Sequence, residues 1–168
     1  MIHVCSLARL YSTIDETGAH HIVTLLKAMD RVKRPAHIEE ANHLILSMDD
    51  VVDEMDGYTP PTDIHVTDLV RFASRWDRRQ PMVIHCFAGI SRSTAAAFVA
   101  ACALNPSRSE DRIAQAIRDA SPTATPNRRI VRLADHLLGR QGRMIGAIES
   151  IGTGHAALEG QPFRIDLE

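Results

Sequence analysis

The stretch Pro81-Met82-Val83-Ile84-His85-Cys86-Phe87-Ala88-Gly89-Ile90-Ser91-Arg92-Ser93-Thr94 carries most of the information in this chain. Its first four residues predict a short buried strand, and the alanine-rich run from Thr94 to Leu104 predicts a helix packed against that strand. A tight loop between them would lie at a helix N-terminus, where unpaired backbone N–H groups carry the positive end of the helix dipole. Such a loop is suited to binding a dianion such as phosphate.

Several side chains of this loop fit phosphate chemistry. Arg92 has a planar guanidinium that can donate to two phosphate oxygens. Cys86 is the group that can attack phosphorus, and the surrounding N–H groups and cation favour its thiolate form. We expect Ser93 to donate a hydrogen bond to the sulfur and His85 to brace the loop through its ring nitrogens. The predicted phosphate-binding residues are Phe87, Ala88, Gly89, Ile90, Ser91 and Arg92.

The pattern His-Cys-x-x-Gly-x-x-Arg-Ser at residues 85–93 resembles the signature of the cysteine-dependent protein tyrosine phosphatase superfamily. The chain length points to the compact, bacterial dual-specificity-like branch of that superfamily. The resemblance implies a tyrosine or dual-specificity phosphatase that hydrolyses phosphomonoesters through a phosphocysteine intermediate. Its partner would be a phosphorylated protein or a small phosphomonoester.

The resemblance also implies a general acid and a residue that holds the hydrolytic water. The similar enzymes place an aspartate just after a buried strand that reads like residues 44–48, and Asp50 matches that position best. Asp49 is the second candidate, and Asp53 and Asp56 stay open because this loop is long and acidic. The pair Pro126-Asn127 resembles one that opens a later helix and helps to hold the water, so Asn127 is predicted to be catalytic; the alternative is an exposed polar residue of the first helical turn.

Composition limits the classes of function. With 168 residues, of which 45% are hydrophobic, the chain can form one ordinary domain, which we place at 1–152, followed by an irregular C-terminal extension at 153–168. The net charge of −2 gives no reason to expect nucleic acid or an acidic membrane as a partner. No apolar run approaches the ~20 residues of a membrane helix, and the start lacks a basic signal region, so we expect a cytoplasmic protein.

The three cysteines and nine histidines show no metal-ligand spacing, and we expect neither a metal nor a cofactor. Cys5 has two interpretations: a partner for a reversible disulfide with Cys86, or, as we favour, a small buried apolar residue.

Hydrophobic periodicity predicts strands at 2–7, 43–48 and 82–84 and helices at 18–29, 62–79 and 91–104. A capping box, Ser107-Arg108-Ser109-Glu110, predicts another helix start, and Pro126 at a first helical position predicts a last one. The alternation predicts an α/β fold with a mostly parallel sheet of four to five strands and helices on both faces. The loop at Cys86 would then lie at the carboxyl edge of the sheet, where such folds bind ligands.

Two other classes of function stay open. A sulfur-transferring or arsenate-reducing thiol enzyme can also use a cysteine in an anion-binding loop, although Arg92, Ser93 and an upstream acid argue against it. A non-catalytic phosphate-binding module is the other class, and the intact Cys86 and Arg92 argue against that one. Within the phosphatase interpretation, the variable loop positions contain no lysine, which favours phosphomonoesters such as phosphotyrosine over multiply phosphorylated inositides.

Overall fold

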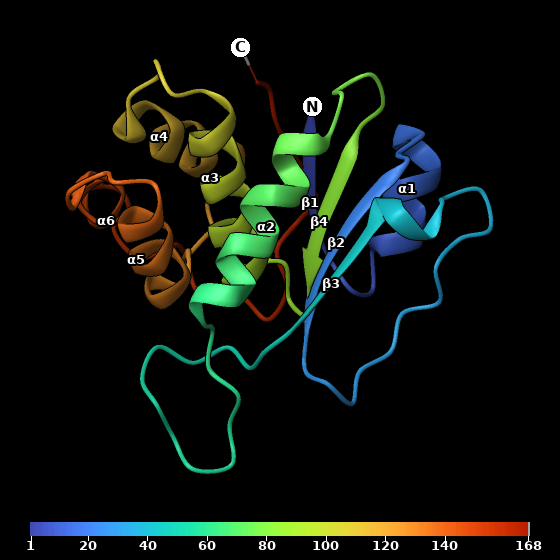
Figure 1. Ribbon diagram of the computed structural model, residues 1–168, viewed down its shortest axis with the longest axis horizontal. Helices are drawn as coiled ribbons and strands as arrows, with labels where there is room; N and C mark the ends of the chain where they lie inside the picture. Colours follow the sequence, from blue (N-terminus) through green and yellow to red (C-terminus); the bar gives the residue numbers. More distant parts are fainter. Residues whose placement is uncertain (168) are drawn as a thin grey trace.

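The computed structural model describes residues 1–167 and has a five-stranded sheet at its centre (Figure 1). The strands lie in the order β3-β2-β4-β1-β5. Their bounds are β1 (Ile2–Ser6), β2 (His21–Leu26), β3 (His43–Ser47), β4 (Met82–Cys86) and β5 (Phe163–Ile165). β5 pairs antiparallel with β1, and all other pairs are parallel. The predicted α/β fold with a mostly parallel sheet is confirmed.

Helices cover both faces of the sheet unequally (Figure 1). One face carries α1 (Leu10–Thr17), and the other carries α2 (Asp63–Arg75), α3 (Arg92–Leu104), α4 (Glu110–Ala120), α5 (Arg128–Leu137) and α6 (Arg143–Ser150). A single 3-10 turn, η1 (Glu40–Asn42), precedes β3 in the described chain. Adjacent residues of β4 point to opposite faces, so that Ile84 packs in the larger core and Val83 in the smaller core under α1.

Helix α3 lies at the centre of the larger core and continues directly from the loop at Cys86. Its residues from Arg92 to Cys102 are all buried, which is unusual for a helix and requires apolar or small side chains on every side. The alanines at 95–97 and 100–101 meet that requirement and allow close packing, and Phe98 is completely buried among the largest core side chains. The start of α3 is therefore held rigidly against β4.

The predicted helix at 18–29 is wrong. Helix α1 ends before Gly18, whose N–H donates to Ile14 O at 2.9 Å, and residues 21–26 form strand β2 instead. The apolar residues of this run fit helical spacing, but a parallel strand covered on both faces is also almost continuously apolar. The β-branched residues Ile22, Val23 and Thr24 favour the strand.

Three predicted helix ends also shift. Ser109, rather than Ser107, is the N-cap of α4, and its Oγ accepts from Arg112 N at 3.4 Å. Pro126 precedes the N-cap Asn127 and is not the first helical residue of α5. Helix α2 ends at Arg75 instead of continuing to 79.

The segment after Gly152 is more ordered than the irregular extension that we expected. Two of its N–H groups bond to the turn before α5: Gly154 donates to Thr125 Oγ1 at 3.1 Å and His155 to Pro122 O at 2.9 Å. Further along, Gly160 N donates to Ala88 O at 2.9 Å, and the chain then adds β5 to the edge of the sheet beside β1. This segment therefore packs against the loop that follows β4.

Candidate active site

The loop from Cys86 to Arg92 lies at the carboxyl end of β4, and four of its backbone carbonyls are turned toward neighbouring segments. Each of four carbonyls accepts a hydrogen bond from a neighbouring segment: Phe87 O from Leu7 N (3.1 Å), Ala88 O from Gly160 N (2.9 Å), Ile90 O from Thr125 N (2.9 Å) and Ser91 O from Asn127 N (3.2 Å). With the carbonyls held on the outside, N–H groups can face the interior of the loop, and Gly89 N donates to Cys86 Sγ at 3.2 Å. This arrangement has the geometry of an anion-binding concavity at a helix N-terminus.

Cys86 is buried, and its sulfur lies against two possible donors. Ser93 Oγ is 3.1 Å from Cys86 Sγ, in addition to the N–H of Gly89. Both groups can stabilise a thiolate, the reactive form of cysteine. Gly89 has φ of +72°, and a Cβ there would lie 2.8 Å from Cys5 C and from Ser6 N, so the backbone of β1 leaves room for glycine alone.

Arg92 is the first residue of α3 and its side chain is buried. One guanidinium nitrogen, Nη1, donates to Met48 O at 2.8 Å, while Nε has no hydrogen-bond partner within residues 1–167. A buried donor without a partner is costly, and an anion in the loop would satisfy it. A surface hollow of ≈ 280 Å³ lined by Lys27, Asp30, Phe87 and Arg92 connects this side chain to solvent.

His85 is completely buried below the loop. Its Nε2 lies 2.8 Å from Thr24 Oγ1, which is also 2.9 Å from His43 Nε2. Burial lowers the pKa of His85 to about 4, so the ring is neutral near pH 7. Its Nδ1 has no hydrogen-bond partner in the described chain. Of the two ring nitrogens that we expected to brace the loop, Nε2 therefore makes the side-chain hydrogen bond and Nδ1 does not. Sequence reasoning did not single out Thr24 and His43, because this contact joins three different strands.

Among the four candidate acids, Asp50 is the one that contacts the loop. Its Oδ1 accepts from Ser91 Oγ at 2.8 Å and from Asn127 Nδ2 at 2.8 Å. Asp49 instead closes the base of its own loop, since its Oδ2 accepts from Thr59 N and its N–H donates to Thr59 O, each at 2.7 Å. Asp53 and Asp56 are exposed and make no hydrogen bond or ion pair with other residues of the described chain.

Asn127 is buried rather than exposed, and its side chain makes contacts in two directions. Its Oδ1 accepts from Arg129 N at 3.0 Å and Ile130 N at 3.1 Å, which caps α5. Its Nδ2 donates to Asp50 Oδ1 and, at 3.3 Å, to Val51 O. The same amide therefore fixes the start of α5 and the position of Asp50.

Arg129 is a further contact of the acidic loop that the sequence analysis missed. Its Nε donates to Pro61 O at 2.7 Å and its Nη1 to Val52 O at 3.4 Å, so that one side chain holds both ends of the loop. Its Nη2 lies 3.6 Å from Glu54. Apart from its nearness to Asn127 in the sequence, no pattern signals this role.

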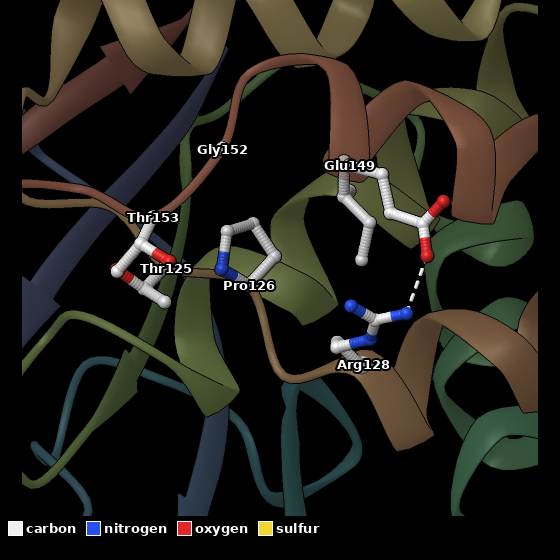
Figure 2. Close-up of a pocket in the computed structure, with 7 residues that line it drawn as sticks. Thr125, Pro126, Arg128, Glu149, Gly152 and Thr153 are labelled. Atoms are coloured by element: carbon white, nitrogen blue, oxygen red, sulfur yellow. Dashed lines mark hydrogen bonds and ion pairs between the residues drawn. The ribbon is translucent and has the colours of Figure 1, made fainter.

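Arg128 has a different environment, shown in Figure 2. It forms an ion pair with Glu149 of α6, beside a small cavity of ≈ 160 Å³ that Pro126 and Thr125 also line. This cation contributes to helix packing, and Arg92 and Lys27 are the cations that line the hollow over the loop.

The three cysteines are free. Cys5 is buried in the smaller core, and this burial raises the pKa of its thiol to about 12. Within residues 1–167, no group of three His, Cys, Asp or Glu side chains could hold a metal ion. In the same residues, no helix has the length and apolar character needed to cross a membrane.

Comparison with known proteins agrees with this geometry. The family model described as protein-tyrosine phosphatase matches residues 55–121, a segment that contains the loop at Cys86 but neither Asp50 nor Asn127. No curated protein matches the sequence. The match covers less than half of the chain, and the matched segment is similar to the protein-tyrosine phosphatase family.

Solved structures extend the likeness to most of the chain. The PTP-2 phosphatase of Cydia pomonella has a TM-score of 0.63 and 15% identity, with 80% of this chain and 84% of that chain covered. The Yvh1 phosphatase domain from Chaetomium thermophilum has a TM-score of 0.61 and 21% identity, with 85% and 93% covered. Human DUSP28 has a TM-score of 0.62 and 16% identity, with 83% and 89% covered. At such identities the likeness concerns the fold, which is that of the tyrosine and dual-specificity phosphatases.

Proposed function

We propose that this protein is a cysteine-dependent phosphatase that hydrolyses phosphomonoesters through a phosphocysteine intermediate, as a tyrosine or dual-specificity phosphatase of the compact, bacterial dual-specificity-like branch. The observation that carries the proposal is the position of Asp50. Ser91 and Asn127 hold its carboxylate at the loop that contains Cys86 and Arg92. A nucleophile, an anion site and an acid therefore meet at one point, which is the set that phosphate-ester cleavage requires.

In the first step, the Cys86 thiolate attacks phosphorus and forms an S–P bond as the ester P–O bond breaks. The inward N–H groups and Arg92 bind the phosphoryl oxygens on which charge accumulates. Asp50 gives its proton to the departing oxygen, which leaves as an alcohol or phenol.

In the second step, a water molecule attacks the phosphocysteine and the S–P bond breaks. Asp50, now ionised, accepts the proton of that water, and Asn127 helps to orient it from the same side of the loop. Ser93 Oγ, 3.1 Å from the sulfur, stabilises the thiolate as it leaves. Inorganic phosphate is the second product, and the enzyme returns to its starting state.

The rim of the site favours an aryl phosphate. Phe87 is 62% exposed and lines the hollow above Arg92, where its ring can pack against that of a phosphotyrosine. One similar structure is PTPMT1 in complex with PI(5)P, with 15% identity and a TM-score of 0.59. The loop here carries no lysine at Phe87, Ala88, Ile90 or Ser91, which gives less support to a phosphoinositide.

A reducing compartment suits the proposed chemistry, since a thiolate at Cys86 must stay unoxidised. We therefore keep the cytoplasm as the proposed location, and the three free cysteines agree with it.

The direct test is hydrolysis of para-nitrophenyl phosphate by the wild type and by Cys86→Ser between about pH 4.5 and 8. Turnover by the wild type and its loss in Cys86→Ser, with vanadate binding retained, supports the proposal. Persulfide or arsenate chemistry at Cys86 without phosphatase activity would favour the thiol-enzyme class. Phosphate binding without any turnover would favour a binding module.

A further inference from the structure

A second hollow lies beside the loop from Cys86 to Arg92, which we call the phosphate loop. The proposed reaction does not use this hollow. It measures ≈ 350 Å³ and is lined by Leu7, Ala8, Phe87, Ala88, Leu158 and Glu159. Five of these six side chains are apolar. Leu158 is 98% exposed and Phe87 is 62% exposed, so two large apolar side chains face solvent at the edge of the site. Such an apolar cluster is typical of a binding surface.

Hydrogen bonds to the phosphate loop fix the walls of this hollow. Leu7 N donates to Phe87 O at 3.1 Å, which ties the turn after β1 to the loop. Gly160 N donates to Ala88 O at 2.9 Å, which ties down the C-terminal segment two residues after Leu158. The carboxylate of Glu159 accepts from Ser6 Oγ at 2.5 Å. The backbone on both sides of the hollow is thus tied to its neighbours, and the side chain of Leu158 is exposed to solvent.

The position of Phe87 indicates what binds there. Its side chain lines both this hollow and the one that opens onto Arg92. A ligand whose phosphate sits at Arg92 therefore passes Phe87 to reach the apolar surface. An extended peptide advances about 3.3–3.6 Å per residue, so residues that flank a phosphorylated side chain can lie on both sides of Phe87, whereas a small phosphomonoester has no flanking residues.

We propose that this hollow is a subsite for an apolar side chain that flanks the phosphorylated residue of a protein substrate. The inference rests on the proposed phosphatase function and names its substrate class: a phosphoprotein with a leucine-like or phenylalanine-like residue within about three positions of the phosphate. The carboxylate of Glu159 at the same wall disfavours an acidic residue at that position.

The test compares phosphotyrosine peptides that differ at one flanking position, with leucine, serine or aspartate at each of three positions on either side. We expect kcat/KM to be about fivefold to tenfold higher for leucine than for serine at one position, and lowest for aspartate. In Leu158→Ser, this preference should fall severalfold while turnover of para-nitrophenyl phosphate stays unchanged. Leu137→Ser, which alters an exposed apolar residue at the far end of α5, is the matched control and should retain the preference.

Each other outcome overturns the subsite. If the wild type cleaves all peptides equally well, the subsite proposal is wrong and the proposed phosphatase function still stands. An equal loss in Leu158→Ser on peptides and on para-nitrophenyl phosphate shows that Leu158 acts on the loop and not on the flanking residue. A dimer that Leu158→Ser abolishes assigns the surface to a second copy of the chain. A wild type without any turnover removes the proposed function and the subsite together.

Discussion

Asn127 Nδ2 lies 2.8 Å from Asp50 Oδ1, and this hydrogen bond joins two residues that are 77 positions apart in the chain. The other atom of the same amide, Oδ1, caps α5. The position of Asp50 is therefore fixed relative to a helix end as well as to the phosphate loop. Although the two residues are joined by this hydrogen bond, each can be substituted separately to measure its own contribution.

Asp50→Asn should lower kcat about 10²-fold or more for alkyl phosphates and much less for para-nitrophenyl phosphate, because a good leaving group needs little protonation. Asp49→Asn should leave this dependence on the leaving group intact, since Asp49 bonds to Thr59 and not to the phosphate loop. The measurement is kcat for a series of aryl and alkyl phosphates of graded leaving-group basicity. A steeper dependence in Asp49→Asn than in Asp50→Asn would assign the acid to Asp49.

Asn127→Asp separates the two contacts of this side chain. A carboxylate still accepts from Arg129 N and Ile130 N, so the cap of α5 and the free energy of unfolding should change by less than about 1 kcal/mol. The donor to Asp50 is lost and the two carboxylates repel each other, which displaces Asp50 from the loop and should lower turnover of poor leaving groups roughly tenfold. Urea denaturation measures the effect on the free energy of unfolding, and steady-state kinetics measures the effect on turnover. Equal activity of the variant and the wild type would show that the hydrogen bond to Asp50 is dispensable.

Arg129→Gln removes the contacts with both ends of the loop that carries Asp50, at Val52 and Pro61. We expect a threefold to tenfold lower kcat for poor leaving groups, roughly 1 kcal/mol, with the KM for phosphate esters unchanged, because phosphate binding does not involve this residue. Arg128→Gln, which breaks the ion pair with Glu149, is the control and should leave the kinetics unaltered. A rise in KM alone in Arg129→Gln would contradict a positioning role.

Gly89→Ala should abolish activity even in protein that still folds. Its Cβ would lie 2.8 Å from backbone atoms of Cys5 and Ser6, and the residue would also adopt φ of +72°. The positive φ alone costs about 1–2 kcal/mol, and relief of the contact moves the loop away from β1. Gly139→Ala has a similar φ of +62° with nothing near its Cβ, so it should lose stability only. Circular dichroism and activity assays distinguish the two variants, and an active Gly89→Ala would contradict the close packing.

His85 should make the protein less stable as the pH falls. Its pKa is lowered by burial to about 4, whereas the unfolded chain has the ordinary value of 6.5. Below about pH 6.5, the unfolded state therefore binds a proton that the folded state does not, and the free energy of unfolding falls until the pH reaches about 4. The contribution of this one residue is on the order of 3 kcal/mol over that window.

The measurement is urea denaturation at several pH values for the wild type and His85→Gln, whose amide nitrogen can replace Nε2 toward Thr24. Because burial lowers the pKa of His43 and His65 as well, the difference between the two proteins isolates His85. Two curves that stay parallel from pH 6.5 to 4 would mean that His85 is not buried in its neutral form.

Local sequence was enough to predict the parts of the fold that depend on neighbouring residues. The strand before Cys86, the tight loop and the alanine-rich helix follow one another directly, so their order specifies the phosphate-binding geometry. Local sequence was not enough for residues 18–29, because their apolar spacing suits a helix and a strand covered on both faces equally well. Pairing with the neighbouring strands β3 and β4 makes residues 21–26 a strand.

The candidate site likewise has a part that local sequence predicts and a part that it does not. Cys86, Ser93 and Gly89 lie within one short loop, and their mutual contacts are local. The resemblance to the phosphatases points to Asp50 after a strand and to Asn127 at the start of a helix. Arg129 and Thr24 could not be predicted, because their partners lie in distant segments that meet only in the folded chain.

The hydrogen bond from Gly160 N to Ala88 O has a consequence for the growing chain on the ribosome. Translation at about 5–20 residues per second separates the synthesis of Cys86 from that of Gly160 by several seconds. Until the later residues emerge, Ala88 O has no protein partner and β1 lacks its outer neighbour β5. The loop from Cys86 to Arg92 thus gains this support only after all four parallel strands have been synthesised, so the candidate active site is completed late in translation.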